Sequence, residues 1–155
     1  MAIERVKEFF KQYDMDKNIK EFDVSSATVE LAAKALGCAP ERIAKTLSFS
    51  VDDKPILIVM AGDAKVDNHK YKEYFGQKAK MLSQDEVESK IGHTVGGVCP
   101  FGINGGITVY LDESLKRFET VFPACGSTNS AIELTIDEME RFSGYKEWIN
   151  VYKLA

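Results

Sequence analysis

Two apolar segments separated by a short charged turn constrain the fold more than any other feature of this chain. Residues Ile43–Val51 and Pro55–Ala61 are rich in Ile, Val, Leu and Phe, and Asp52-Asp53-Lys54 separates them. Apolar segments of this length bounded by turn residues are typical of paired β-strands. We therefore expect two strands joined by a tight turn. A lysine, Lys45, alternates with the apolar residues of the first strand, which is an unusual place for a charge.

Helical patterns occur on both sides of these strands. Residues Ile3–Tyr13 carry apolar side chains at helical spacing. A second helix is predicted to begin after an N-cap at Ser25 or Ser26 and to end at Gly37, with a further helical turn at Pro40. The remaining helices are predicted at Asp67–Phe75, from the capping box Ser83-x-x-Glu86 to Lys90, and from Thr135-x-x-Glu138 to Gly144.

Further short segments favour β-structure. They are Ile19–Phe22, Ile107–Leu111, Glu119–Ala124, Ala131–Thr135 and Trp148–Leu154. The strands come as hairpin-like pairs with helices inserted between them, which differs from the regular alternation of a doubly wound sheet. We therefore predict an α+β fold in which helices flank a mixed, barrel-like β-sheet.

The composition is that of one globular domain covering residues 1–155. Apolar residues make up 45% and charged residues 28%, so a core can form without disulfides or metal. The three cysteines form no CxxC pair, and the two histidines fit no metal-ligand pattern. The N-terminus lacks the apolar stretch of a signal peptide, and no run is long enough to span a bilayer. We expect a cytoplasmic protein without a membrane partner.

The net charge of −4 argues against tight binding to long nucleic acid, and no DNA partner is expected. The lysines are nevertheless unevenly distributed. Five of them fall within sixteen residues, at Lys65, Lys70, Lys72, Lys78 and Lys80. This cluster is either a solvated helix face or a surface that contacts RNA.

Lys45 and a glycine-rich segment are the first candidates for chemistry. Lys45 either keeps its ammonium in water at a sheet edge or places it in a pocket, where it would stabilise an oxyanion. The segment Gly96-Gly97-Val98-Cys99-Pro100-Phe101-Gly102 has no regular period. Its glycines would let a ligand approach backbone N–H groups, although a plain surface turn is the alternative. No Gly-Lys-Ser/Thr ending follows it, so it is not a phosphate-binding P-loop.

Two other candidates remain open from the residues alone. Cys99 has His93 nearby in sequence, and a thiolate nucleophile requires such a base. The turn Ser127-Thr128-Asn129 would either bind a polar group of a substrate or serve only as a turn. Cys38 and Cys125 are expected to be small core residues.

Taken together, these segments resemble the YbaK/EbsC family of aminoacyl-tRNA deacylases, which is related to the editing domain of bacterial prolyl-tRNA synthetases. The matching segments follow in chain order. They are Glu30-Leu31-Ala32-Ala33, Ile43-Ala44-Lys45-Thr46-Leu47, the Gly96–Gly102 segment with its GxxxP pattern, Gly126-Ser127, and Ala131-Ile132-Glu133-Leu134. Their order and spacing agree over nearly the whole chain.

The resemblance implies a compact YbaK-like fold and hydrolysis of the ester that joins an amino acid to the terminal adenosine of tRNA. It implies that Lys45 is the residue most tied to activity, that Gly96 to Pro100 hold the aminoacyl group, and that no metal or cofactor is used. Phe22 stands where some members have a tyrosine. Thr46 is similar to members that act on cysteinyl or small aliphatic substrates rather than to the alanine-specific ones, which tend to have asparagine there.

We therefore predict a free-standing editing hydrolase of mischarged tRNA, with tRNA for proline carrying cysteine or another small amino acid as the substrate. The partners would be the acceptor end of aminoacyl-tRNA and prolyl-tRNA synthetase. Two alternatives stay open: a module that binds aminoacyl-tRNA or a synthetase without hydrolysis, and a hydrolase of small esters that depends on Cys99.

Overall fold

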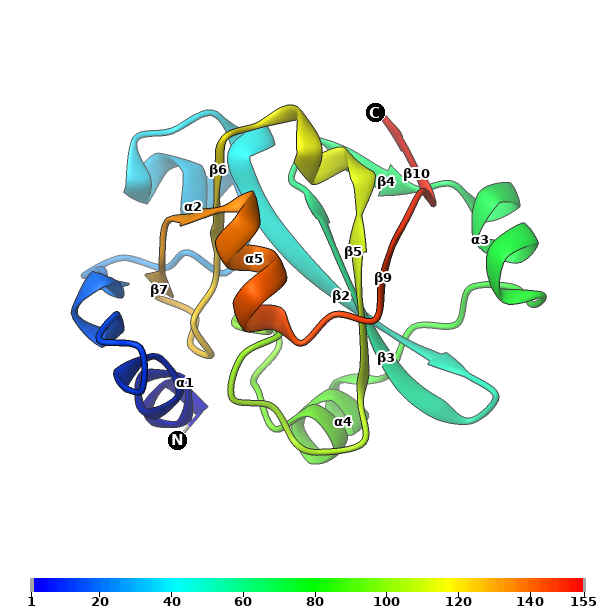
Figure 1. The fold of residues 1–155 in the computed structure, drawn as a ribbon, viewed down its shortest axis with the longest axis horizontal. Helices are drawn as coiled ribbons and strands as arrows, with labels where there is room; N and C mark the ends of the chain where they lie inside the picture. Colours follow the sequence, from blue (N-terminus) through cyan, green and yellow to red (C-terminus); the bar gives the residue numbers. More distant parts are fainter. Residues whose placement is uncertain (1, 155) are drawn as a thin grey trace.

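The computed structural model describes residues 2–154, and its centre is a mixed six-stranded sheet of order β8-β6-β2-β3-β5-β9 (Figure 1). The strands are β2 (Ile43–Val51), β3 (Lys54–Ala61), β5 (Thr108–Asp112), β6 (Thr120–Pro123), β8 (Leu134–Thr135) and β9 (Glu147–Ile149). The pairs β2–β3 and β6–β8 are antiparallel, whereas β2–β6, β3–β5 and β5–β9 are parallel. The predicted α+β fold with a mixed sheet is confirmed.

The strands β2 and β3 form the predicted hairpin. Their turn consists of Asp52 and Asp53, which have φ values of 51° and 64°. Positive φ at both positions is typical of the type I′ turn, whose twist matches that of the strands it joins. Lys54, which we expected in the turn, is the first residue of β3 and pairs with Val51.

Two small antiparallel pairs lie outside the main sheet. The strand β1 (Lys20–Glu21) pairs with β7 (Ser130–Ala131), and β4 (Ala64–Val66) pairs with β10 (Tyr152–Leu154). The strand β4, which the sequence did not suggest, follows β3 after the turn Gly62–Asp63. The C-terminal segment therefore lies against the chain immediately after the central hairpin (Figure 1).

Two strands predicted as continuous are each divided in two. Residues Ala131–Thr135 contribute to β7 and then to β8, because the chain leaves β1 and joins β6. Trp148–Leu154 is divided in the same way: β9 pairs with β5 and β10 pairs with β4. At the second break the N–H of Val151 donates to the side chain of Asp112, at Oδ2 and 2.9 Å.

The helices lie close to their predicted positions. They are α1 (Ala2–Lys11), α2 (Val29–Leu36), α3 (Asn68–Phe75), α4 (Gln84–Glu86) with a π-helical continuation (Val87–Ile91), and α5 (Ile136–Ser143). Shorter 3₁₀ turns cover Asp16–Asn18, Pro40–Arg42 and Glu113–Arg117. Both predicted capping boxes form. The predicted N-cap of α2 is wrong: Thr28 accepts from the N–H of Leu31, while Ser26 donates to the Thr128 carbonyl.

Helices α1 and α5 cover one part of the core through aromatic contacts. Phe10 lies 5.5 Å from Phe142 and 4.9 Å from Phe101, measured between ring centroids. The helices α1 and α3 lie at opposite ends of the long axis of the molecule (Figure 1). Within residues 2–154, no helix has the length and apolar character that crossing a membrane requires.

Candidate functional site

A cavity of about 340 Å³ opens beside β2. Its walls come from β2, the start of α2, the segment Thr94–Val98 and the chain around β6 and β7. Most of the lining is apolar, with Ala32, Leu82, Val98 and Phe122 among its members. Such a concave, largely apolar site with few polar groups is the usual form of a small-molecule pocket.

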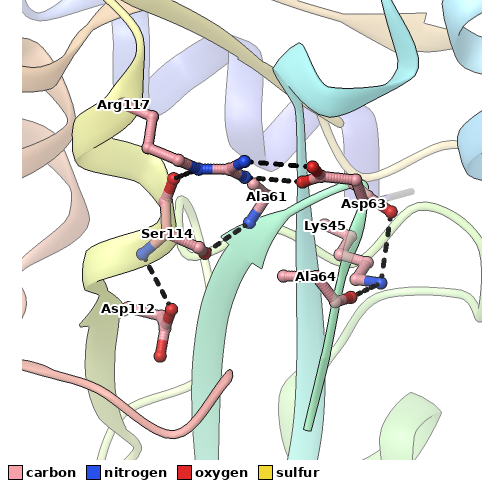
Figure 2. Close-up of polar contacts among 8 residues, drawn as sticks. Lys45, Ala61, Asp63, Ala64, Asp112, Ser114 and Arg117 are labelled. Carbon is pink, nitrogen blue, oxygen red and sulfur yellow. Dashed lines mark hydrogen bonds and ion pairs between the residues drawn. The ribbon is translucent and has the colours of Figure 1, made fainter. Parts of the chain in front are cut away.

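Lys45 is the cation in the described wall of this cavity. Its side chain is partly buried, and its ammonium donates to the carbonyl oxygens of Gly62, at 3.4 Å, and of Ala64 (Figure 2). Burial lowers the pKa of Lys45, and the nearby carboxylates of Asp63 and Glu30 oppose that effect. Lys45 therefore lines a cavity with its ammonium held by protein carbonyls, and its catalytic role stays a prediction.

The two hydrogen bonds of the Lys45 ammonium leave one of its N–H groups free to contact a ligand. An ammonium has three N–H donors, and the two carbonyls that hold it use two of them. One N–H donor of the ammonium therefore remains for a further partner such as a ligand. A fixed cation in a partly dry site interacts more strongly with a developing negative charge than the same cation in water.

The segment Thr94–Val98 forms another wall through a tight turn. The N–H of Gly97 donates to the Thr94 carbonyl at 3.0 Å, and Gly96 has a φ of 92°, which favours glycine. Gly97 packs so closely on the 126–128 turn that a Cβ added there would lie 2.7 Å from the backbone of Ser127. In addition, the Gly97 carbonyl accepts from the N–H of Gly126 at 2.9 Å. Backbone contacts therefore fix this wall.

Alternate N–H groups of the loop remain available to a ligand. The N–H groups of Gly97 and Cys99 are already used, because they donate to the Thr94 carbonyl and to His93 Nδ1 respectively. Among the described residues, none accepts a hydrogen bond from the N–H of Gly96 or Val98, and both residues line the cavity. The role that we expected for the loop N–H groups stays a prediction, and Gly96 and Val98 are the cavity-lining residues whose N–H groups, within the described chain, remain free for it.

The second half of the glycine-rich segment lies in the core rather than in the cavity wall. Phe101 is fully buried and contacts the rings of Phe9 and Phe10. Pro100 is buried beside it, and Gly102 packs against the backbone of Arg5. Within the predicted segment, the cavity is lined by Gly96 and Val98, whereas the residues from Cys99 to Gly102 anchor the loop.

The geometry of Cys99 argues against a nucleophile. Its Sγ atom is fully buried, lies 3.9 Å from His93 Nδ1 and is not part of the cavity wall. Burial raises the pKa of the Cys99 thiol to about 12, so the thiol stays protonated near neutral pH. The pKa of His93 is lowered by its own burial, and its Nδ1 already accepts from the N–H of Cys99.

Phe22 and the turn Ser127-Thr128-Asn129 support a wall of the cavity instead of lining it. The N–H of Phe22 donates to the Asn129 carbonyl at 2.8 Å, and Asn129 Nδ2 donates to the Phe22 carbonyl at 3.0 Å. The Thr128 carbonyl accepts from the N–H of Ser26. Ser127 Oγ is 2.6 Å from Ser130 Oγ. These bonds hold Ser26 and Ser130 at the cavity.

Several cavity residues carried no sequence signal that we recognised. They are Ser26, Thr28, Ser48, Met81, Phe122 and Ser130. Small polar residues at strand and turn positions are too common for their pattern to indicate a site. Thr46, which was predicted, lines the cavity, and its buried Oγ1 has no hydrogen-bond partner among the described residues. A buried hydroxyl without a partner calls for an explanation, and a ligand in the cavity supplies one.

The clustered lysines do not form one helix face. Lys70 donates to the Tyr152 carbonyl at 2.8 Å, and Lys72 and Lys78 line a separate hollow beside α3. Lys65 stands directly opposite Lys153 in the β4–β10 pair, and both are exposed. Lys65 is also close enough to Lys45 to lower its pKa. Across residues 2–154, no group of three or more His, Cys, Asp or Glu side chains is arranged to hold a metal ion.

Comparison with known proteins identifies the family. The family model of the aminoacyl-tRNA editing domain matches residues 23–142. The chain belongs to this family. The match includes β2, the Thr94–Val98 wall and the turn at Ser127, and so all the walls of the cavity described above fall within the editing domain. The family-level resemblance drawn from the sequence is therefore confirmed.

Relatives of this editing domain include free-standing proteins and segments of larger ones. The uncharacterized protein YwhH of Bacillus subtilis (strain 168) is 55% identical over 154 residues, which cover 99% of this chain and 98% of YwhH. Proline–tRNA ligase of Geobacillus sp. (strain WCH70) is 29% identical over 101 residues, which are 64% of this chain but only 18% of the ligase.

Solved structures share the fold over nearly its full length. A protein described as a proposed trans-editing enzyme for prolyl-tRNA synthetase superimposes with a TM-score of 0.87 at 25% identity, covering 98% of this chain and 97% of that one. The hypothetical protein APE2540 superimposes with a TM-score of 0.84 at 25% identity, covering 96% and 99%. Their agreement confirms a YbaK-like α+β fold.

Proposed function

We propose that this chain is a free-standing editing enzyme that hydrolyses the ester bond between an amino acid and the end of a tRNA that should not carry it. The observation that carries the proposal is the position of Lys45, whose ammonium is held by two carbonyls at the wall of an apolar cavity. Family membership and the likeness to a proposed trans-editing enzyme support the same reaction.

In the proposed reaction, water adds to the ester carbonyl and the carbonyl oxygen becomes an oxyanion. The bond to the ribose oxygen then breaks, that oxygen takes up the proton lost by the water, and the products are a free amino acid and uncharged tRNA. An aminoacyl ester is already activated, so no protein nucleophile is needed. This agrees with the protonated, buried state of Cys99.

Lys45 and the N–H groups of Gly96 and Val98 would stabilise the oxyanion. All three residues line the same cavity. Removing one such donor from an enzyme typically costs about 3–4 kcal/mol of barrier, which corresponds to a rate loss of about 10²–10³-fold. Because Lys45 acts as a cation, its contribution is lost when it deprotonates. Its lowered pKa therefore predicts an alkaline loss of activity at a lower pH than an ordinary lysine would give.

The aminoacyl group would lie against Thr46. Its buried Oγ1, which has no partner among the described residues, would gain a hydrogen-bond partner from the substrate, while Leu82, Val87 and Phe122 would offer apolar contacts to the amino-acid side chain. One methylene changes binding in an apolar pocket by only about 1–3 kcal/mol, so a hydroxyl that must be paired is the sharper discriminator. Cysteine or a similarly small amino acid on tRNA for proline is the proposed substrate.

Lys65 and Lys153 would contact phosphates of the acceptor end. Like charges directly opposite each other on neighbouring strands destabilise a sheet, and an RNA phosphate between them would reverse that effect. Prolyl-tRNA synthetase, which charges the proposed tRNA, is the proposed functional partner.

A deacylation panel tests the function. Cys-, Ala-, Ser-, Pro- and 2-aminobutyryl-tRNA are each incubated with the wild type, Lys45→Ala and Lys45→Arg. We expect one small aminoacyl-tRNA to be hydrolysed by the wild type, with a loss of about 10²–10³-fold in Lys45→Ala and partial activity in Lys45→Arg.

Binding of these tRNAs by the wild type without hydrolysis of any would favour the non-catalytic binding module instead. Unchanged rates in Lys45→Ala would refute the role of Lys45. Loss of activity on treatment with a thiol-alkylating reagent would revive the hydrolase that depends on Cys99.

A further inference from the structure

The two carbonyls that hold Lys45 belong to Gly62, in the turn after β3, and to Ala64, the first residue of β4, and the turn is anchored by charged side chains. The turn joins β3 to β4 and contains Gly62 and Asp63. The Asp63 carboxylate forms a bidentate ion pair with Arg117, whose Nη1 and Nη2 lie 3.0 Å and 2.5 Å from its two oxygens (Figure 2). Paired bonds of this kind fix direction as well as distance.

The anchor of Arg117 continues into the core. Arg117 Nε donates to the Ser114 carbonyl at 2.9 Å, and Ser114 Oγ accepts from the N–H of Ala61 at 3.0 Å (Figure 2). Asp112 accepts from the N–H of Ser114 and from the N–H of Val151, at 2.9 Å each. Asp112 and Ser114 are fully buried. The network therefore connects the last residue of β3 to the turn that follows it.

Close packing fixes the same turn from its other side. A Cβ added at Gly62 would overlap the carbonyl oxygen of Pro40 and would lie 2.8 Å from Val29 Cγ1. The turn is thus held between the helical segments near α2 and the 3₁₀ turn Glu113–Arg117. Neither Asp63 nor Arg117 lines the cavity.

We propose that Asp63 and Arg117 are positioning residues for Lys45: their ion pair holds the Gly62 and Ala64 carbonyls in the arrangement that directs the ammonium at the substrate. This inference rests on the proposed function of Lys45 in hydrolysis. Asp63 also contributes its negative charge to the surroundings of the ammonium, and Arg117 offsets part of that charge.

The charged groups around Lys45 give the two partners opposite electrostatic effects. Asp63 and Glu30 raise the pKa of Lys45, and Lys65 lowers it. Hydrogen bonding to Arg117 lowers the pKa of Asp63, so Asp63 is ionised wherever Lys45 titrates. Removing the Asp63 charge therefore moves the pKa of Lys45 down, whereas removing the Arg117 charge leaves the Asp63 carboxylate unopposed and moves it up.

The test measures the pH dependence of kcat and KM for the wild type, Asp63→Asn and Arg117→Gln, with the uncatalysed ester hydrolysis subtracted at each pH. We expect kcat to fall at least tenfold in both variants while KM changes less than threefold. We expect the alkaline loss of activity to move to lower pH in Asp63→Asn and to higher pH in Arg117→Gln. Glu21→Gln, which breaks the surface ion pair with Lys7, is the matched control and should change neither.

Two outcomes would overturn the inference: wild-type kcat in both variants, or a shift of the alkaline limb in the same direction in both. A merely structural ion pair would lower activity in both variants without moving their alkaline losses of activity in opposite directions. Titration of the Lys45 side chain by ¹³C NMR, followed at Cε, gives the same comparison without catalysis. If no aminoacyl-tRNA is hydrolysed by the wild type, the proposed function fails, while opposite NMR shifts in the two variants would still support the arrangement of Asp63, Arg117 and Lys45.

Discussion

Two walls of the cavity are held in place by different kinds of contact. The strand wall is β2, and its Lys45 is held by side-chain hydrogen bonds to Gly62 and Ala64, beside the Asp63–Arg117 ion pair. The loop wall, Thr94–Val98, depends on backbone packed against backbone at Gly97 and Ser127. Charge and pH should therefore affect the first wall, and side-chain volume should affect the second. Gly97→Ala and Thr46→Val test this difference, and substitutions at Lys65, Lys153 and Cys99 test residues outside both walls.

Gly97→Ala should have the largest effect of these substitutions, because it adds a methyl group where the loop wall has no free space. The new Cβ would lie 2.7 Å from backbone atoms of Ser127, so one of the two segments has to move. Overpacking of this kind costs about 1–3 kcal/mol, and we expect a fall of several degrees in Tm with at least a tenfold loss of deacylation. Thermal melting and single-turnover deacylation measure both.

Gly105→Ala is the control for that substitution, because a Cβ at Gly105 meets no atom of residues 2–154 within 4 Å. It should change neither Tm nor activity. Equal effects of the two substitutions would mean that close packing does not define the loop wall.

Thr46→Val tests the strand wall without changing its charge. It replaces a buried, unpaired hydroxyl with a methyl group of similar size. Removing such a group should leave stability unchanged or raise it by about 1 kcal/mol. Deacylation of the preferred substrate should fall about tenfold, because the substrate loses its hydrogen-bond partner. If Thr46→Val lowered stability and activity together, the prediction that the hydroxyl serves the substrate and not the fold would be wrong.

Reversing the charges of Lys65 and Lys153 should weaken tRNA binding a few-fold and reduce its dependence on salt. Filter binding of uncharged tRNA at several salt concentrations measures the effect independently of hydrolysis. Lys11→Glu with Lys17→Glu changes the net charge equally at the α1 end of the molecule, away from β4 and β10 (Figure 1). If the Lys11→Glu, Lys17→Glu control weakens tRNA binding as much, the loss of binding is due to overall charge and not to the lysines of β4 and β10.

Cys99→Ala should have the smallest effect on activity, less than about twofold. The thiol is protonated, fully buried and outside the cavity wall. A small loss of stability is expected from the missing sulfur atom, and it should appear in Tm alone. A loss of more than tenfold in kcat at unchanged Tm would contradict this assignment.

The sequence predicted the fold well where the signals were local. The hairpin turn at Asp52-Asp53 and both capping boxes depend on neighbouring residues, and all of them form. The divisions at Glu133 and Asn150 were missed because they depend on which distant strand each half pairs with. A pattern with a period of two residues does not record the identity of the partner strand.

The candidate site was predictable only in part, for a similar reason. Lys45 interrupts an apolar strand and the loop is rich in glycine, so these residues carried a signal, whereas Thr46 was predicted only from the family resemblance. The Asp63–Arg117 pair carried none, since exposed charges of both signs are common and the two residues are far apart in sequence. The division of the loop into lining and anchoring residues required the positions of Phe9 and Phe10.

The cavity walls come from segments that span most of the chain, from Ser26 through Lys45 and Val98 to Ala131. Contacts between residues so distant in sequence form slowly, because long loops must close before the contacts stabilise anything. A nascent chain that has emerged only as far as β3 therefore contains Lys45 but no cavity around it. The ammonium of Lys45 is therefore enclosed during synthesis only after the turn at Ser127 has been made.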